Sequence, residues 1–373
     1  MTTVRLLKNG VEAFPAMHAA IDGASSSISL EMYIFADDET GREFRRHLVA
    51  AAGRGVKVRL LIDAWGSWNL PDSFWDDLRS AGGTVRWFHP LLQGLLPFRN
   101  HRKLLLIDSR LAYVGGMNIA DAYYRGERGA LPWRDNALEI EGSEAAVLRR
   151  SFLRMWYKAS SPLRRKVLRL RRSRRIIDAA GGSVRFLESG PENPMLPVRR
   201  AYRTIVKRAA RNIDLAMGYF YPNGGMLRAL KRAVRRGVRV RLMVPLHTDV
   251  PASRWAAWGL YGRVLRAGVE VWEYAATMMH SKLAIADDTL IAGSANLDIR
   301  SGRINYELVA MVTDGSLAAQ ARADFEEDLK QSVPITLSAW QKRPFLQKVK
   351  EWISYCLLAR FDVFLARREI RKI

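Results

Sequence analysis

The chain carries one motif twice, as Asn100-His-Arg-Lys-Leu-Leu-Leu-Ile-Asp108 and again as Met279-His-Ser-Lys-Leu-Ala-Ile-Ala-Asp287. Both copies follow the pattern His-x-Lys-x-x-x-x-Asp, and a turn of small residues that ends in Asn follows each copy (115–118 and 293–296). Two imidazoles can attack and protonate a phosphodiester, while lysine and asparagine side chains can hold its oxygens. The repeated motif therefore predicts chemistry on a phosphodiester.

An internal repeat extends well beyond the two motifs, because further segments of the first half recur in the second half in the same order. The matching pairs are Ile28–Phe35 with Ile213–Phe220, Gly53–Asp63 with Arg235–Pro245, and Gly83–Trp87 with Gly268–Trp272. A repeat of this length indicates two duplicated domains, because the units of a solenoid are much shorter. We expect a first repeat over 1–160, a basic linker or helix over 161–182, a second repeat over 183–330, and a basic amphipathic helical extension over 331–373.

Alternating patterns within the first half predict strands and helices in turn. Short apolar runs predict strands over residues 27–35, 56–62, 84–88 and 103–107. Apolar residues at helical spacing predict helices over residues 41–54 and 73–80. The expected fold class is therefore α/β, with two similar α/β sandwich domains.

The predicted strand at each motif determines which side chains should lie together. Because residues i and i+2 of an extended chain point to the same face, the His and Lys of each motif should project together. These pairs are His101 with Lys103 and His280 with Lys282. Asp108 and Asp287 complete the catalytic motif, but they should face away from the lysines. We expect these two aspartates to have a structural role.

Composition limits the class of protein and the kind of partner. A chain of 373 residues is long enough for two domains, and 49% hydrophobic with 26% charged residues indicates a folded protein. The net charge of +23 favours a polyanionic partner, and both nucleic acid and an anionic membrane surface qualify. The single cysteine, Cys356, excludes an intramolecular disulfide and a site built from cysteines. We see no signal peptide and no apolar run long enough to span a membrane, so we expect a cytoplasmic, soluble or membrane-surface protein.

The two motifs with their turns resemble the signature of the phospholipase D superfamily, and the resemblance extends over roughly residues 10–330. Four stretches are most similar to the bacterial cardiolipin synthase branch. They are residues 101–123, 133–135, 293–301 and 305–307. Many members of that branch carry two N-terminal transmembrane helices, and this chain resembles the shorter type without them.

The resemblance implies two halves that pack about a pseudo-two-fold axis and share one active site. One histidine forms a phosphohistidine and the other acts as acid and base; we assign His101 as the nucleophile and His280 as the acid/base, although the reverse stays open. It further implies that Lys103, Lys282, Asn118 and Asn296 hold phosphate oxygens, with Ser294 as an added hydroxyl donor. The candidate carboxylates that orient the histidines are Asp135 and Glu307. No metal and no cofactor is expected.

Three features favour lipid over nucleic acid as the substrate. An apolar loop over residues 91–98 precedes His101, and a basic segment with apolar residues at helical spacing lies between 342 and 372. Basic residues are also concentrated over 163–175. Each has a simpler interpretation: a packed loop, a helix packed on the protein body, and a solvated linker or nucleic acid contact.

We therefore expect a cardiolipin synthase-like phosphatidyltransferase, peripheral on the cytoplasmic side of the cell membrane. It would move a phosphatidyl group from an anionic phospholipid such as phosphatidylglycerol to a hydroxyl of a second lipid. The alternatives are a phospholipase D-type hydrolase and, less favoured, a phosphodiesterase or nuclease acting on nucleic acid.

Overall fold

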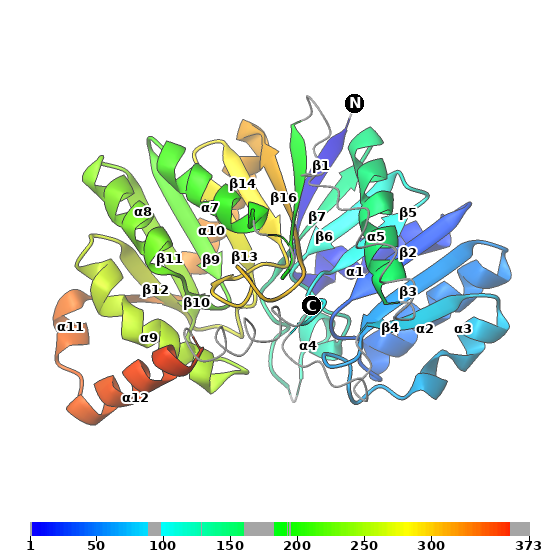
Figure 1. The fold of residues 1–373 in the computed structure, drawn as a ribbon, viewed down its shortest axis with the longest axis horizontal. Coiled ribbons are helices and arrows are strands. Elements are labelled where there is room, and N and C mark those ends of the chain that lie inside the picture. Colours follow the sequence, from blue (N-terminus) through cyan, green and yellow to red (C-terminus); the bar gives the residue numbers. More distant parts are fainter. Residues whose placement is uncertain are drawn as a thin grey trace.

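The chain forms two α/β halves that lie side by side, each with a central sheet (Figure 1). The computed structural model describes residues 2–88, 98–127, 129–159, 183–191, 193 and 195–358. The predicted basic linker over 161–182, most of the apolar loop over 91–98 and the end of the C-terminal segment lie outside the described residues. The expected α/β fold class is confirmed.

The first sheet has seven strands in the order β1-β7-β6-β5-β2-β3-β4. Strands β2, β3 and β4 are parallel to one another, and the other neighbours in the sheet pair antiparallel. The bounds are β1 (Thr3–Lys8), β2 (Ser27–Met32), β3 (Lys57–Asp63), β4 (Thr84–Phe88), β5 (Leu104–Ile107), β6 (Leu111–Gly115) and β7 (Asn136–Glu141).

The second sheet repeats this order strand for strand. Read from the corresponding end it is β8-β16-β14-β13-β9-β11-β12, with β17 added at the edge. The bounds are β8 (Val184–Ser189), β9 (Asn212–Met217), β11 (Arg239–Pro245), β12 (Glu270–Tyr274), β13 (Lys282–Ala286), β14 (Thr289–Gly293), β16 (Glu307–Thr313) and β17 (Ser332–Ile335). A short parallel pair, β10 (Phe220–Tyr221) with β15 (Leu297–Asp298), lies beside it. The sequence repeat is thus a repeat of topology.

Most helices cover the outer face of a sheet, whereas α5 and α10 pack against the central core between the two sheets (Figure 1). The first half has α1 (Asn9–Asp22), α2 (Glu39–Gly53), η1 (Asp72–Trp75), α3 (Asp76–Ser80) and α4 (Asp121–Tyr124), followed by η3 (Ser143–Ala146) and α5 (Val147–Lys158). The second half has α7 (Pro197–Arg208), α8 (Gly224–Arg235), α9 (Pro251–Leu265) and α10 (Gly315–Lys330). Helix α2 begins before the predicted position because the Asp38 carboxylate accepts a hydrogen bond from the Gly41 amide and caps it.

The apolar runs at the two motifs are continuous because both faces of their strands are buried. In β5, Leu104 and Leu106 belong to a central core, whereas Leu105 and Ile107 belong to the core beneath the outer helices. In β13, Leu283 and Ile285 belong to the same central core, whereas Ala284 and Ala286 belong to the core beneath the outer helices of the second half. The inner faces of the two sheets therefore pack on each other, which holds the two motifs in one place.

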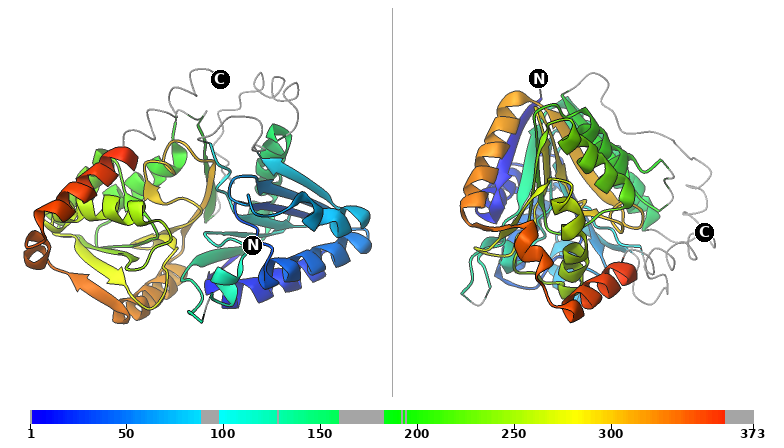
Figure 2. Two further views of the ribbon diagram at one scale, coloured as in Figure 1. Left: turned by 90° about the horizontal axis from the view of Figure 1, so that it is seen from below. Right: turned by 90° about the vertical axis from the view of Figure 1, so that its left-hand side faces the viewer.

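The C-terminal extension packs on the second half rather than standing apart. Strand β17 pairs with β12, and α11 (Leu337–Gln341) and α12 (Phe345–Cys356) follow. Helix α12 lies along α9, at the side of the second half away from the first (Figures 1 and 2). Its buried face holds Glu351, which pairs with Arg343 at 2.6 Å. Across the described residues, none of the helices combines the length and apolar character that a bilayer-spanning segment needs.

Candidate active site

The two motifs meet through reciprocal backbone hydrogen bonds between the halves. The amide of His101 donates to the carbonyl of Tyr306 at 3.0 Å, and the amide of Tyr306 donates to the carbonyl of Arg99 at 2.9 Å. The same arrangement recurs at the second motif: His280 donates to Arg134, and Arg134 donates to the carbonyl of Met278, both at 2.8 Å. Each motif is thus fastened to the segment just before a carboxylate of the other half.

This fastening places each histidine against a carboxylate from the opposite half. His101 Nδ1 lies 3.0 Å from Glu307 Oε2, and His280 Nδ1 lies 2.8 Å from Asp135 Oδ2. The sequence pointed to Asp135 and Glu307, but it did not say which histidine each would meet. Because Nδ1 is occupied in both rings, Nε2 is the nitrogen left for chemistry in each of them.

Burial determines the charge state of the two histidines. Burial lowers the pKa of His101, and Lys103 adds to this although Glu307 opposes it. Burial, followed by the charge of Lys282, lowers the pKa of His280 well below its ordinary value. Both rings are therefore neutral in the free protein at pH 7. A neutral imidazole has the free lone pair that a nucleophile needs.

The two carboxylates respond to burial differently. Burial raises the pKa of Asp135 to about 6. Burial also pushes the pKa of Glu307 upward, but His101, Lys103 and Ser294 outweigh it, so the pKa lies below its usual value. Glu307 therefore stays ionised to a lower pH than Asp135 does.

Both lysines are buried, and their amines lie beside the histidines. Burial, with repulsion between the two ammonium groups, lowers the pKa of Lys103 to about 7. Burial lowers the pKa of Lys282 to about 8. Lys103 Nζ donates to the carbonyl of His101 at 2.7 Å, and Lys282 Nζ donates to the carbonyl of His280. The charge of a phosphate beside the two buried amines would raise their pKa values again.

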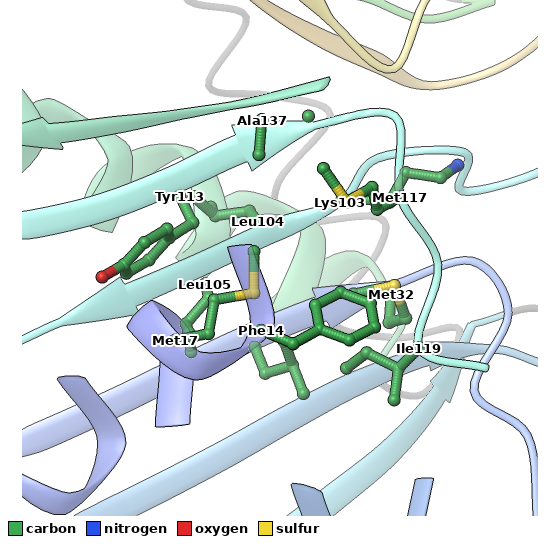
Figure 3. A pocket seen from close by; sticks show the side chains of 12 residues that line it. Phe14, Met17, Met32, Lys103, Leu104, Leu105, Tyr113, Met117, Ile119 and Ala137 are labelled. Atoms are coloured by element: carbon green, nitrogen blue, oxygen red, sulfur yellow. The ribbon is translucent and has the colours of Figure 1, made fainter. Parts of the chain in front are cut away.

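The aliphatic part of the Lys103 side chain is buried in the interior of the first half. Its aliphatic stem lines an apolar pocket between α1 and the first sheet, with Phe14, Met17, Met32 and Met117, and its amine points away from these side chains (Figure 3). The apolar surroundings of the stem are one source of the desolvation that lowers the pKa of the amine.

The side chains of Asn118 and Asn296 are both buried, but they differ in their hydrogen bonds. Asn118 donates to the Tyr123 hydroxyl at 2.9 Å and accepts from the Ile34 amide at 3.2 Å. The side-chain oxygen of Asn296 is buried and has no hydrogen-bond partner among the described residues. Both amides remain candidates to contact a phosphate.

The Ser294 hydroxyl contacts the carboxylate of Glu307 and the backbone of Leu308. It donates to Glu307 at 2.5 Å and accepts from the Leu308 amide at 3.0 Å, so it holds the carboxylate. The equivalent position, Gly116, cannot carry a side chain, because a Cβ there would lie 2.4 Å from Asp135 Oδ1. The two carboxylates are therefore supported differently, which is one reason why their pKa values differ.

The final aspartate of each motif lies away from the histidines. Asp108 accepts hydrogen bonds from the amides of Ser25, Ser26 and Ser27 at 2.7–2.9 Å, just before β2. Asp287 binds the amides of residues 210–212 in the same way before β9, at 2.7–3.0 Å. These contacts favour the structural role over a place among the catalytic residues, and the role itself stays a prediction.

Sequence reasoning missed an aromatic lining around the histidines. The Tyr33 ring lies edge-on to His101 at 4.9 Å. The Tyr123 hydroxyl is 3.1 Å from His280 Nδ1, and Trp133 and Tyr219 lie about the same ring at 5.9 and 6.0 Å. Tyr123 and Trp133 fall within stretches already noted, but nothing in their spacing marked them, because they reach His280 across the interface.

A fold of two topologically equal α/β halves, joined so that two His-x-Lys motifs share one buried site, defines a phosphodiester-processing protein of the phospholipase D type. The family model described as "Cardiolipin synthase, PLD-like domain" matches residues 17–156 and 202–329. The chain belongs to this family.

Curated relatives agree with this family. The cardiolipin synthase of Geobacillus sp. (strain WCH70) is 35% identical over 361 residues, which cover 95% of this chain and 72% of the relative. The major cardiolipin synthase of Bacillus subtilis (strain 168) is 32% identical over 362 residues, which cover 95% of this chain and 74% of the relative.

Solved structures share the fold at low sequence identity. A phosphatidylserine synthase of Haemophilus influenzae Rd KW20 superposes with a TM-score of 0.74 at 13% identity, covering 97% of this chain and 94% of that chain. A polyphosphate kinase of Porphyromonas gingivalis superposes with a TM-score of 0.59 at 17% identity, covering 97% of this chain and 53% of that chain. At such identity the likeness concerns the fold alone.

Proposed function

We propose that this protein is a phosphatidyltransferase that makes cardiolipin-type lipids through a phosphohistidine intermediate. The observation that carries the proposal is the crossed arrangement of His101 with Glu307 and His280 with Asp135, with a buried lysine amine beside each histidine. Membership of the cardiolipin synthase family supports phospholipid substrates, with a phosphatidylglycerol-like donor and acceptor.

In the first step, Nε2 of His101 attacks the phosphorus of the donor while the bond from phosphorus to the glycerol oxygen breaks. His280 gives its Nε2 proton to that oxygen, and glycerol leaves. His280 is neutral in the free protein, and the incoming phosphate anion raises its pKa enough to carry this proton. Asp135 stabilises the imidazolium during this step, as the carboxylate of a catalytic triad does.

In the second step, His280 removes the proton from a hydroxyl of the acceptor lipid, whose oxygen attacks the phosphorus. The phosphorus–nitrogen bond breaks, and His101 returns to its free form. Lys103 and Lys282 stabilise the charge on the non-bridging oxygens in both steps. Water in place of the acceptor lipid would give phosphatidic acid instead.

A donor that needs no protonation of its leaving group separates the roles of the two histidines. With phosphatidyl-p-nitrophenol, His280→Ala should release about one equivalent of p-nitrophenol and then stop, while His101→Ala should release none. A phosphatidyl adduct on the peptide that contains His101, detected by mass spectrometry, would confirm the nucleophile. The reverse result would exchange the roles, and slow steady turnover by both variants would argue against a covalent intermediate.

Phosphatidylglycerol vesicles separate transfer from hydrolysis. Cardiolipin and glycerol should form with the wild type and with neither histidine variant. Phosphatidic acid as the product would indicate the hydrolase. Cleavage of an oligonucleotide that depends on both histidines, without lipid turnover, would favour the nuclease alternative.

We also propose that the protein works as a peripheral protein on an anionic membrane surface. The face of α12 turned away from α9 exposes Phe345, Leu346 and Trp352, each at least 64% exposed. Trp65 and Trp68, in the loop after β3, are also exposed, and Arg99 stacks on Trp65 two residues before His101. Aromatic residues next to basic ones suit the interface of an anionic bilayer.

Flotation with phosphatidylglycerol vesicles tests this surface. Leu346→Glu and Trp352→Glu should each reduce the bound fraction severalfold without changing the Tm. Val333→Glu is the matched control, because Val333 is 48% exposed but lies on the edge strand β17. Equal binding by all variants would contradict the proposed surface.

A further inference from the structure

A second cluster of histidines lies outside the active site, on the helical layer of the first half. His18 is on α1 and His47 is on α2, and the two helices pack against each other. Each helix adds a carboxylate four residues from its histidine, Asp22 on α1 and Glu43 on α2. Side chains four residues apart share one face of a helix, so each helix presents one histidine and one carboxylate to the other.

The four side chains are within reach of one another. The imidazoles of His18 and His47 stack with their centroids 4.4 Å apart. His18 Nδ1 lies 3.8 Å from Glu43 Oε1, and His47 Nδ1 lies 2.7 Å from Asp22 Oδ1. One possible donor atom from each of His18, Glu43 and His47 lies within 4.8 Å of the others.

His18 is the side chain that points to a ligand. It is only 7% exposed, and its Nε2 atom has no hydrogen-bond partner among the described residues. Its Nδ1 faces Glu43 at 3.8 Å, which is too long for a hydrogen bond. Two donor atoms that share one zinc ion, each at about 2.0–2.2 Å from it, lie roughly 3.3–3.6 Å apart. At 3.8 Å, Nδ1 of His18 and Oε1 of Glu43 are slightly farther apart than two such ligands, so a small rotation of either side chain would bring them to the ligand distance.

The surrounding contacts resemble the support that metal ligands usually have. Asp22 holds Nδ1 of His47, which leaves Nε2 of that ring with a lone pair. Arg125 binds Glu43 Oε2 at 2.8 Å, which leaves Oε1 on the side of His18.

We propose that His18, Glu43 and His47 bind one divalent transition-metal ion, Zn²⁺ being the best match, with water completing the coordination. Two imidazole nitrogens and one carboxylate oxygen form a common zinc ligand set. The ion would join α1 to α2 and stabilise the first half at a place separate from the lysines and histidines of the active site. The proposal does not depend on the proposed function.

Binding of zinc to the full-length protein, after treatment with a chelator, tests the site. Calorimetric titration with Zn²⁺ should give one saturable site, and Co²⁺ should show the visible absorption of a four-coordinate ion. His47→Ala and Glu43→Gln should each weaken binding at least about tenfold, and Asp22→Asn should weaken it by about 10–100-fold as an outer partner. The zinc-dependent rise in Tm should disappear with the ligands.

Two controls locate the ion. His101→Ala/His280→Ala should keep the zinc affinity of the wild type, and so should His247→Ala, whose exposed imidazole follows β11. Loss of binding in the first control would place the ion in the active site and overturn the proposal. Wild-type affinity in both His47→Ala and Glu43→Gln, or no saturable binding of Zn²⁺ by the wild type, would overturn it as well. His47 and Glu43 are each about a quarter exposed, so both variants should fold.

Discussion

The histidine of each motif lies against a carboxylate that the other half supplies. His101 meets Glu307 and His280 meets Asp135, and both carboxylates are fully buried. A carboxylate in this position fixes the tautomer of the imidazole and stabilises the imidazolium that forms during the reaction. Under the proposed function, neither half could therefore carry out its part of the reaction without the other.

Replacement of these carboxylates by amides tests their role. Asp135→Asn and Glu307→Gln should each lower kcat by about 10³–10⁴-fold, because an amide neither fixes the tautomer nor balances the charge. The double variant should lose much less than the product of the two, since the residues act as one unit. Asp214→Asn is the control: Asp214 is equally buried and pairs with Arg241 at 2.6 Å, so its loss should lower the Tm and leave kcat nearly unchanged. A small effect on kcat in both site variants would contradict the assignment.

The two buried lysines should lower the stability of the folded chain at neutral pH. The pKa of Lys103 is about 7 in the folded chain and 10.5 in the unfolded one, so between these values the unfolded chain binds more protons and stability rises with pH. Lys103→Met should be inactive but more stable at pH 7, with a Tm higher by about 2 °C or more. Its advantage over the wild type should shrink as pH rises towards 10.5. Thermal unfolding at several pH values measures this, and an advantage that grows with pH would contradict it.

At the scale of elements, the aspartate that ends each motif forms a turn. Asp108 and Asp287 both have positive φ values, 51° and 49°, and both bind the amides that precede the first parallel strand of their half. Each aspartate thereby sets where its strand begins relative to the motif strand. The same turn in both halves explains why the motif ends in Asp.

Removal of this turn contact should affect stability rather than chemistry. Asp108→Ala should destabilise the chain by about 2–3 kcal/mol, because charge-assisted bonds to the amides of Ser25, Ser26 and Ser27 are lost. We expect kcat to stay within a few-fold of the wild type at a temperature where the variant is folded. Denaturant unfolding and lipid turnover measure the two effects. A loss of kcat like that of His101→Ala at unchanged stability would make Asp108 catalytic after all.

At the scale of the whole molecule, a buried ion pair joins the halves beside the site. Arg134, next to Asp135, donates to Asp328 of α10 at 2.7 Å, and both side chains are almost completely buried. An unpaired charge at such a place costs far more than the pair itself contributes. Loss of the pair should therefore disturb the packing of the two halves and lower the free energy of unfolding.

A double-mutant cycle measures the interaction energy between Arg134 and Asp328. Arg134→Ala should destabilise the chain by about 3–5 kcal/mol, because buried Asp328 loses its 2.7 Å partner and keeps only the longer contact with Lys8 at 3.6 Å. Arg134→Ala/Asp328→Ala should cost less than the sum of the two single changes. Arg5→Ala is a surface control, since Arg5 is 66% exposed and pairs with Glu139, and it should cost under about 1 kcal/mol. Additive effects in the Arg134 cycle would show that the pair does not couple the halves.

Much of the fold and part of the site could be predicted from the repeat. Strands β4 and β5 and the helix over 41–54 were placed to within two residues, because their apolar spacing is local information. The hydrogen bond from Ser294 to Glu307 could not be predicted, because the sequence neighbours of Ser294 do not reveal which group accepts it. The histidine cluster of α1 and α2 was missed because its members are contributed by two helices that meet only in the fold.

The sequence by itself determined the duplicated α/β architecture, the two His-x-Lys motifs and the family. These features follow from the order and spacing of residues along one chain, which local backbone geometry converts into strands, helices and turns. Only the tertiary structure decided that Glu307 serves His101 and Asp135 serves His280, and that burial lowers the pKa of the lysines. These properties depend on which groups meet across the interface and on how little water remains there, and no spacing within either half carries that information.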